Sequence, residues 1–187
     1  MNKPFALRRD RGFTLIEVLV TVIILAVGLL GLEGLQMSSM NNQLESYQRA
    51  QAMLMLEDMA NRIRSNAVAA KAGAYAAASD YGLRAEEDCS TKVLTAERDL
   101  CEWNLALAGS GVTLDTKNAG SVLGARGCVE SIPGTANGEI NIRLTIAWQG
   151  MSKTRSPASD CGEDQYGDDD AYRRTASLDT VLANLTL

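Results

Sequence analysis

Arg11-Gly12-Phe13-Thr14-Leu15-Ile16-Glu17, followed by the apolar run from Val18 to Leu32, decides the architecture of this chain. Basic residues precede this stretch and a long polar portion follows it, which is the layout of an N-terminal signal that inserts into a membrane. Glu17 is the exception, because placing a charge within a membrane costs roughly 2.5 kcal/mol or more. An acidic residue at such a position predicts a function for Glu17.

Charge is distributed unevenly on the two sides of this segment. The first twelve residues carry a net charge of +3, whereas the whole chain of 187 residues carries −5, so the chain from Phe13 onward carries −8. Basic segments stay on the cytoplasmic side of a membrane, which predicts a cytoplasmic leader, 1–12, and an acidic exported remainder. An acidic domain lacks the clustered Lys and Arg of a general nucleic-acid binder, so we expect no nucleic-acid partner.

The apolar run continues into one long predicted helix. No proline occurs from Phe13 to about Asn66, and helix-forming residues dominate the second half. A helix of this length extends roughly 80 Å, too long for a compact domain of this size. We predict a hydrophobic transmembrane or assembly half, 13–35, and an amphipathic half, 36–66. One stripe with four-three-four spacing is expected to be buried: Ala52, Leu56, Met59 and Ile63. Polar residues of this half are expected to face water: Asn41, Glu45, Gln48, Asn61 and Arg62.

The remainder, 67–187, is predicted to form a globular head. Residues 67–81 are rich in alanine and predict a short helix or a surface loop, while Thr95 to Ala108 predict a helix with Thr95 as its N-cap. Strands are predicted at 125–132, 139–149 and 174–185, and the turn-rich residues 133–138 join the first two as a hairpin. The predicted fold class is α+β, a long N-terminal helix packed on a small antiparallel sheet.

The four cysteines all lie in the exported part: Cys89, Cys101, Cys128 and Cys161. An even number in an exported domain favours two disulfides, for which the sequence allows three pairings. We favour Cys89 with Cys101 and Cys128 with Cys161, because the first pair is close in sequence. A zinc site is the alternative, and it is disfavoured because the chain has no histidine and no Cys-x-x-Cys pair.

The segment 160–170 is strongly acidic and raises the alternative of a calcium site, since hard cations prefer several carboxylate oxygens. Its spacing is not that of an EF-hand loop. We therefore interpret it as a solvated loop that Arg173 and Arg174 partly neutralise, and we expect no metal and no cofactor.

The short basic leader ending in Gly12, with Phe13-Thr14-Leu15-Ile16-Glu17, resembles the class III signal peptide of type IV prepilins and pseudopilins. This resemblance implies that a membrane-embedded prepilin peptidase cuts between Gly12 and Phe13 and methylates the new amino terminus of Phe13. The apolar helix then stays on the mature protein and enters the helical core of a filament. There Glu17 is expected to face the positively charged amine of Phe13 on a neighbouring subunit. An unpaired Glu17 that reaches the headgroup zone is the alternative.

A second resemblance is narrower. The helix containing Glu102-Trp103 and the strand 142–150, which reads Ile-Arg-Leu-Thr-Ile-Ala-Trp-Gln-Gly, are similar to the PilV family of minor pilins, the type IV pilus modification proteins. This resemblance implies a pilin-like fold and a role in pilus biogenesis, twitching motility and adhesin display. Its implied partners are other minor pilins, the major pilin and a large tip adhesin. The implied location is the inner membrane, with a single span and a periplasmic head, and afterwards the extracellular pilus or fimbrium.

Two other functions remain open, and catalysis has little support. The chain has no histidine, so it has no Ser-His-Asp triad and no Cys-His pair, and no phosphate-binding loop follows a strand. We therefore expect a structural protein rather than an enzyme. One alternative is a pseudopilin of a type II secretion system, which shares the N-terminal motif. The other is a binding module for a host surface or DNA at a pilus tip.

Overall fold

A computed structural model of the chain describes residues 12–76, 79–83, 87–109, 113–114, 117–118, 122–133 and 139–183. The contacts group into two compact units, Met1–Asn42 and Gln43–Leu187. The helix α1, Leu15–Ser65, contributes residues to both units, and every described strand belongs to the second. The predicted leader lies almost wholly outside the described residues, which begin at Gly12.

The helix α1 is continuous over 51 residues, in agreement with the helix predicted from Phe13 to about Asn66. Its interior contains no proline, and a Cβ added at Gly28, Gly31 or Gly34 would have nothing within 4 Å. These glycines therefore form part of the helix and receive no close contact from elsewhere in the described structure. In the first unit, the side chains of α1 are exposed along their whole length.

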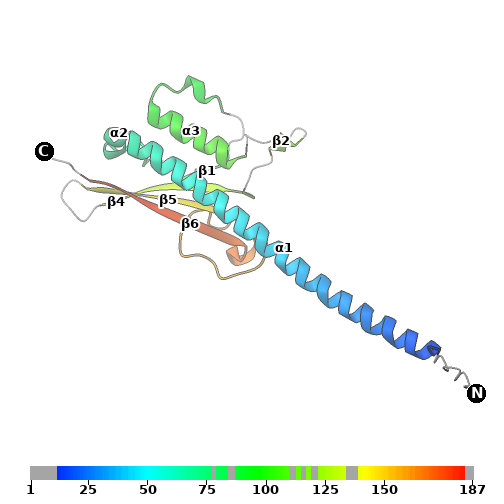
Figure 1. The fold of residues 1–187 in the computed structure, drawn as a ribbon. Helices are drawn as coiled ribbons and strands as arrows, with labels where there is room; N and C mark the ends of the chain where they lie inside the picture. Colours follow the sequence, from blue (N-terminus) through cyan, green and yellow to red (C-terminus); the bar gives the residue numbers. More distant parts are fainter. Residues whose placement is uncertain are drawn as a thin grey trace, which may run out of the picture. The chain divides into compact units, whose positions relative to one another are not determined.

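The second unit contains a four-stranded antiparallel sheet in the order β1-β4-β5-β6 (Figure 1). Its strands are β1, Ser79–Tyr81, β4, Arg126–Pro133, β5, Ile140–Gln149, and β6, Arg173–Leu182. The short strands β2, Thr113–Leu114, and β3, Lys117–Asn118, pair separately. The strands β4, β5 and β6 confirm the three predicted strands, with no bound shifted by more than three residues.

The core lies between the second part of α1 and one face of this sheet. The predicted stripe from Ala52 to Ile63 is fully buried, and so are Leu144 and Ile146 of β5. Because β5 alternates its side chains between two faces, its apolar residues at even-numbered positions all meet α1 in one cluster. Burial of each large aliphatic side chain contributes about 1.5–3 kcal/mol, so this stripe anchors α1 to the sheet.

The helix α3, Thr95–Leu107, packs against both α1 and β4. Its buried face includes Leu100, Trp103 and Leu107, as the spacing predicts. The Trp103 indole N–H donates to the Met55 carbonyl of α1 at 3.2 Å, while its ring covers Gly127 of β4. The predicted N-cap was wrong, because Thr95 is the first helical residue and the residue before it offers no capping side chain.

The alanine-rich connector contains the short helix α2, Ala67–Lys71, which is one of its two predicted forms. It also contains the edge strand β1, which the sequence analysis missed. Between them Tyr75 is fully buried in the core cluster, so this part of the segment is not a surface loop. Residues 134–138 of the predicted hairpin turn lie outside the described residues. The end of the last predicted strand, after Ala183, also lies outside them.

Candidate functional site

The predicted processing and assembly residues lie together at the start of α1. Gly12 to Thr14 precede the helix, and Phe13 is 84% exposed. The Glu17 backbone N–H donates to the Thr14 carbonyl at 3.1 Å, so Glu17 lies in the first helical turn. A carboxylate there interacts favourably with the positive end of the helix dipole. This local geometry keeps Glu17 close to the chain's future amino terminus if cleavage follows Gly12.

The apolar part of α1 has an unusual surface for a water-soluble helix. Its large apolar side chains from Phe13 to Leu35 are all about half exposed or more. By length and composition the helix can cross a membrane, although a signal sequence near an N-terminus passes the same test. A helix that is apolar all round requires lipid or other helices around it.

The first polar tie between α1 and the sheet is at Glu45. Its carboxylate accepts hydrogen bonds from Arg174 Nη2 at 3.0 Å and from the Met151 backbone N–H at 2.9 Å. Burial acts to raise the pKa of Glu45, but these hydrogen bonds outweigh it and lower the pKa below the ordinary 4.5. Glu45, which was expected to face water, keeps 29% of its side chain exposed, and its partner in β6 lies 129 residues away in the sequence.

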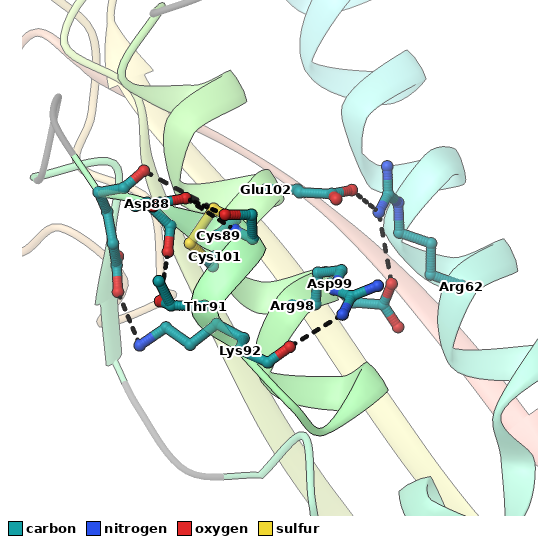
Figure 2. Close-up of a disulfide and its surroundings, with 11 residues drawn as sticks. Arg62, Asp88, Cys89, Thr91, Lys92, Arg98, Asp99, Cys101 and Glu102 are labelled. Atoms are coloured by element: carbon teal, nitrogen blue, oxygen red, sulfur yellow. Dashed lines mark hydrogen bonds and ion pairs between the residues drawn. A yellow bond between two sulfur atoms is a disulfide. The ribbon is translucent and has the colours of Figure 1, made fainter.

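A second tie joins the end of α1 to α3 and is drawn in Figure 2. Arg62 donates to Glu102 and lies 3.3 Å from Asp99 Oδ1. On the other side of Asp99, the Tyr75 hydroxyl donates to Oδ2 at 2.6 Å. Burial and the Asp99 carboxylate raise the pKa of Tyr75 to about 12. Arg62 was also expected to face water, and its side chain stays 31% exposed while it makes these ion pairs.

The first disulfide joins Cys89 to Cys101 of α3, with the Cα atoms 5.6 Å apart. Cys89 begins a short 3-10 helix, Cys89–Thr91, which Asp88 caps by accepting from the Ser90 backbone N–H. Lys92 then forms an ion pair with Glu87, so this small loop is fixed by polar contacts as well as by the disulfide (Figure 2).

The second disulfide joins Cys128 of β4 to Cys161, with the Cα atoms 5.9 Å apart. Both pairings are those favoured from the sequence. The loop around Cys161 is also held by Arg173, whose Nη1 donates to the Ser159 carbonyl at 2.6 Å and the Cys161 carbonyl at 3.0 Å. This guanidinium, buried at the start of β6, therefore organises a long connection that contains little regular structure.

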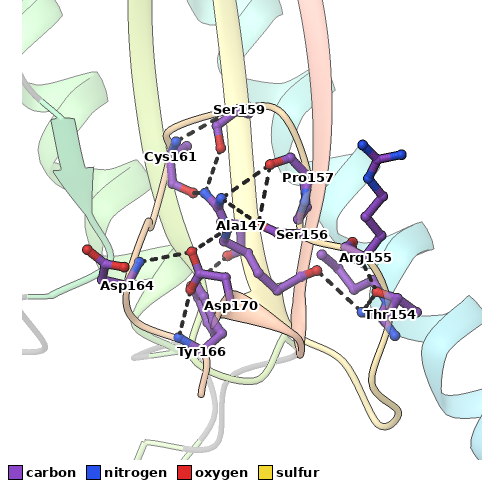
Figure 3. A network of polar contacts seen from close by, with 12 residues as sticks. Ala147, Thr154, Arg155, Ser156, Pro157, Ser159, Cys161, Asp164, Tyr166 and Asp170 are labelled. Carbon is purple, nitrogen blue, oxygen red and sulfur yellow. Dashed lines mark hydrogen bonds and ion pairs between the residues drawn. The ribbon is translucent and has the colours of Figure 1, made fainter. Parts of the chain in front are cut away.

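Asp170 is the counterion of Arg173, and both side chains are at least 95% buried. The Arg173 Nε lies 3.1 Å from Asp170 Oδ2, an ion pair without the alignment of a good hydrogen bond. The same carboxylate accepts from the backbone N–H groups of Asp164 at 2.9 Å and Tyr166 at 3.3 Å, as Figure 3 shows. The acidic segment is thus not simply a solvated loop, because one of its acids is a buried structural group.

The other acids of this segment do not gather into a metal centre. Among the described residues, no three carboxylate, cysteine or histidine groups are placed to hold one ion. Arg174 is not a partner of the loop acids either, since it extends to Glu45 on α1. Arg173 does pair with an acid of this segment, as predicted, although the pair is buried. The contact of Arg174 with Glu45 was missed, because no local pattern in the sequence indicates it.

One comparison with known proteins gives a positive result. Residues 7–32 match the family model of the prokaryotic N-terminal methylation motif. No curated protein and no solved structure matches the chain. The match covers Gly12, Phe13 and Glu17 together with most of the apolar run. This prepilin-type motif, on a long apolar helix that continues into an α+β head, supports a type IV pilin or pseudopilin subunit.

Proposed function

We propose that this protein is a minor pilin, an assembly subunit of a type IV pilus that joins other minor pilins in a tip or priming complex. The observation that carries the proposal is the methylation motif at the start of a helix whose apolar side chains are exposed. A scaffold role, rather than catalysis, is in keeping with this motif. The narrower similarity of Glu102-Trp103 and the strand 142–150 to the PilV family favours a minor over a major pilin.

In this proposal the prepilin peptidase cuts after Gly12 and methylates Phe13, and α1 holds the subunit in the inner membrane with a periplasmic head. On assembly the apolar part of α1 leaves lipid and packs among helices of other subunits. Glu17 then attracts the amine of Phe13 on a neighbour. Two unit charges about 4 Å apart attract by about 4 kcal/mol at an effective dielectric of 20, which offsets part of the desolvation of both groups.

In this proposal the surfaces of the head determine which other subunits bind next to this one. The Cys89–Cys101 disulfide fixes a short loop to α3, and Arg62 ties α3 to α1. The Cys128–Cys161 disulfide and the Asp170–Arg173 pair fix the loop around Cys161 to the sheet. Rigid surfaces lose little conformational entropy on binding. This rigidity supports a role as a docking subunit beside the major pilin and a large tip adhesin.

Glu17→Ala tests the assembly step, with Glu57→Ala as the matched control because Glu57 is another exposed acid of α1. We expect Glu17→Ala to insert in the membrane and lose its leader normally but to be absent from sheared pili, while Glu57→Ala is present. Normal incorporation of Glu17→Ala would refute the pairing.

Deletion of the gene separates the pilus from a secretion system. The proposal expects loss or strong reduction of surface pili and twitching, with protein export unchanged. Loss of export with normal piliation would instead identify a type II secretion pseudopilin.

A further inference from the structure

The strand β6 lies at one edge of the sheet, and its backbone groups alternate between the sheet and that edge. The Gly150 backbone N–H donates to the Tyr172 carbonyl at 2.7 Å, and this pair continues the register of β5 with β6. Bonded and non-bonded pairs alternate along an antiparallel ladder, so the even-numbered residues of β6 bond to β5. The backbone N–H and C=O groups of its odd-numbered residues therefore point away from the sheet.

Contacts within the head close the two ends of this edge and leave its middle open. The Ala171 carbonyl accepts from the Thr154 backbone N–H at 2.7 Å. The Ala183 carbonyl accepts from Lys71 Nζ, also at 2.7 Å. Between these ends, no contact among the described residues uses the outward backbone groups of Thr175, Ser177, Asp179 and Val181.

This open edge lacks the features that prevent pairing with another chain. Proteins protect exposed sheet edges with short strands, bulges, prolines or lysines. The opposite edge has such protection, because β1 is three residues long and its register with β4 is irregular. In contrast, β6 pairs over ten residues without a register shift, and 175–181 contains no proline and no lysine. The charge of Asp179 is paired with Arg143 at 2.8 Å. The edge of β6 is therefore long, regular and unprotected.

The core is incompletely covered beside this edge. Ala176 and Leu178, on the α1 side of β6, pack on the core but stay partly exposed, and so does Met53 of α1. Met53 follows Glu45, which binds β6, by two steps of four residues, so it lies on the flank of α1 next to β6. The helix α3 contacts the other flank. A strand added beside β6 would bury these three apolar side chains.

The flank of α1 beside β6 also carries an exposed charge. Arg49 lies one turn before Met53 and forms no ion pair with a described residue. Four residues of helix advance about 6 Å, and two residues of a strand advance about 6.6 Å. An added strand with an apolar residue against Met53 therefore places the residue two positions away beside Arg49. An acidic residue there complements the guanidinium.

We propose that the outer edge of β6, from Thr175 to Val181, binds an extended segment of a different exported chain as an added strand. On the α1 side this segment carries an apolar residue against Met53 and Leu178 and, two positions away, an acidic residue against Arg49. In such strand addition, backbone hydrogen bonds give affinity and alternate side chains give specificity. The inference rests on the proposed function, because assembly with other subunits brings a different exported chain to this head.

A second copy of this chain does not fit the edge. In an antiparallel pair of β6 strands, the residues that face the partner's α1 are Ala176, Leu178 and Thr180, so Arg49 gains no acidic partner. A parallel pair needs a stagger, because the outward groups are on odd-numbered residues in both strands and parallel bonding sets odd against even. A staggered pair does not close as a two-fold dimer.

The test places a photo-reactive phenylalanine analogue at Thr175 or at Val181 of the full-length chain in cells. The matched control carries it at Glu130, which is exposed on the same face of the sheet but two strands from this edge. We expect both edge positions to cross-link to one segment of one different chain, at residues about six apart, as for a paired strand. That segment is expected to contain the acidic and apolar residues two positions apart. Glu130 is expected to give little product.

Ser177→Pro removes an outward N–H and leaves the bonds to β5 in place. Ser177→Ala is its matched control, because both changes lose the hydroxyl contact with Thr145. We expect Ser177→Pro to lower the Thr175 product at least about tenfold, equivalent to 1.4 kcal/mol, and Ser177→Ala to leave it unchanged. Arg49→Glu lies outside the sheet and is expected to lower this product roughly threefold, whereas Arg155→Glu, at another exposed arginine, does not. Arg49→Glu decides the matter if Ser177→Pro does not fold.

Products that contain a second copy of this chain, or attachment sites without the strand spacing, would overturn the proposal. So would equal yields at Thr175 and Glu130, or equal effects of the two changes at Ser177.

The gene deletion keeps the two proposals apart. Loss of pili on deletion, without a cross-link from the β6 edge, overturns the added strand and leaves the minor-pilin role standing. A cross-link with the strand spacing and normal piliation supports the added strand and contradicts that role.

Discussion

Replacing Arg173 with methionine tests whether the buried pair with Asp170 organises the loop around Cys161. The change leaves the Asp170 carboxylate buried without a counterion and removes the guanidinium that donates to three carbonyl oxygens. Removing one partner of a buried ion pair costs about 3–5 kcal/mol. For a unit of this size each kcal/mol lowers Tm by about 2–4 °C, so we expect a fall of about 6–20 °C.

The assay is thermal and urea unfolding of the mature full-length chain in detergent, and the transition of the head, rather than that of the membrane helix, is monitored. Arg155→Met is the matched control, because Arg155 belongs to the same loop but points away from the network (Figure 3) and is exposed. Its expected effect is below about 0.5 kcal/mol. The double variant with Asp170→Leu should cost less than the sum of the two single changes. An effect of Arg173→Met as small as that of Arg155→Met would refute the reasoning.

Three further changes probe the ties of α1, α3 and the sheet. Tyr75→Phe removes the hydroxyl that donates to Asp99 and is expected to cost about 1.5–3 kcal/mol in urea unfolding, since the acceptor is charged. Gly127→Ala sets a methyl 2.4 Å from the Trp103 ring and is expected to cost about 1–3 kcal/mol in the same assay. Glu45→Gln is expected to lower stability at pH 7, and its difference from the natural chain should vanish in acid unfolding. Because the folded pKa of Glu45 is depressed, its stabilisation is present above the ordinary 4.5 and is lost as pH falls through the lower folded value.

Two of these changes have a matched control. Tyr47→Phe alters a hydroxyl of a half-exposed tyrosine and should change stability by less than about 0.5 kcal/mol. Gly34→Ala adds a methyl with nothing within 4 Å and should leave unfolding of the second unit unchanged. A pH-independent effect of Glu45→Gln, or equal effects of Tyr75→Phe and Tyr47→Phe, would contradict the assigned contacts.

The long elements were predictable because their patterns are local. The stripe from Ala52 to Ile63 shows the helix period, and the alternation along β5 shows the strand period. The edge strand β1 was missed because three residues within an alanine-rich segment carry no period. Tyr75 was missed because one large apolar residue in such a segment does not reveal which core it enters.

The candidate site was predictable only where its signal is contiguous. Glu17 stands out because its neighbours are apolar, so one residue breaks the pattern. The partners of Glu45 and Arg62 lie in elements far away in the sequence, so no local spacing of residues predicts these contacts. Gln48 is buried although it was expected to face water, and its position four residues before Ala52 on the buried stripe was the available signal.

The pairing of β6 also determines when the head can form during synthesis. The chain emerges amino terminus first, so α1 is complete long before β6 exists, yet β6 supplies ten residues of pairing to β5 and the arginine that holds Glu45. Contacts so distant in sequence form late and slow folding. Until the last strand is made, β5 has an unpaired edge, and the partly formed head is prone to aggregation. A chain truncated before Arg173 therefore cannot complete the sheet of its head, even though its N-terminal motif is intact.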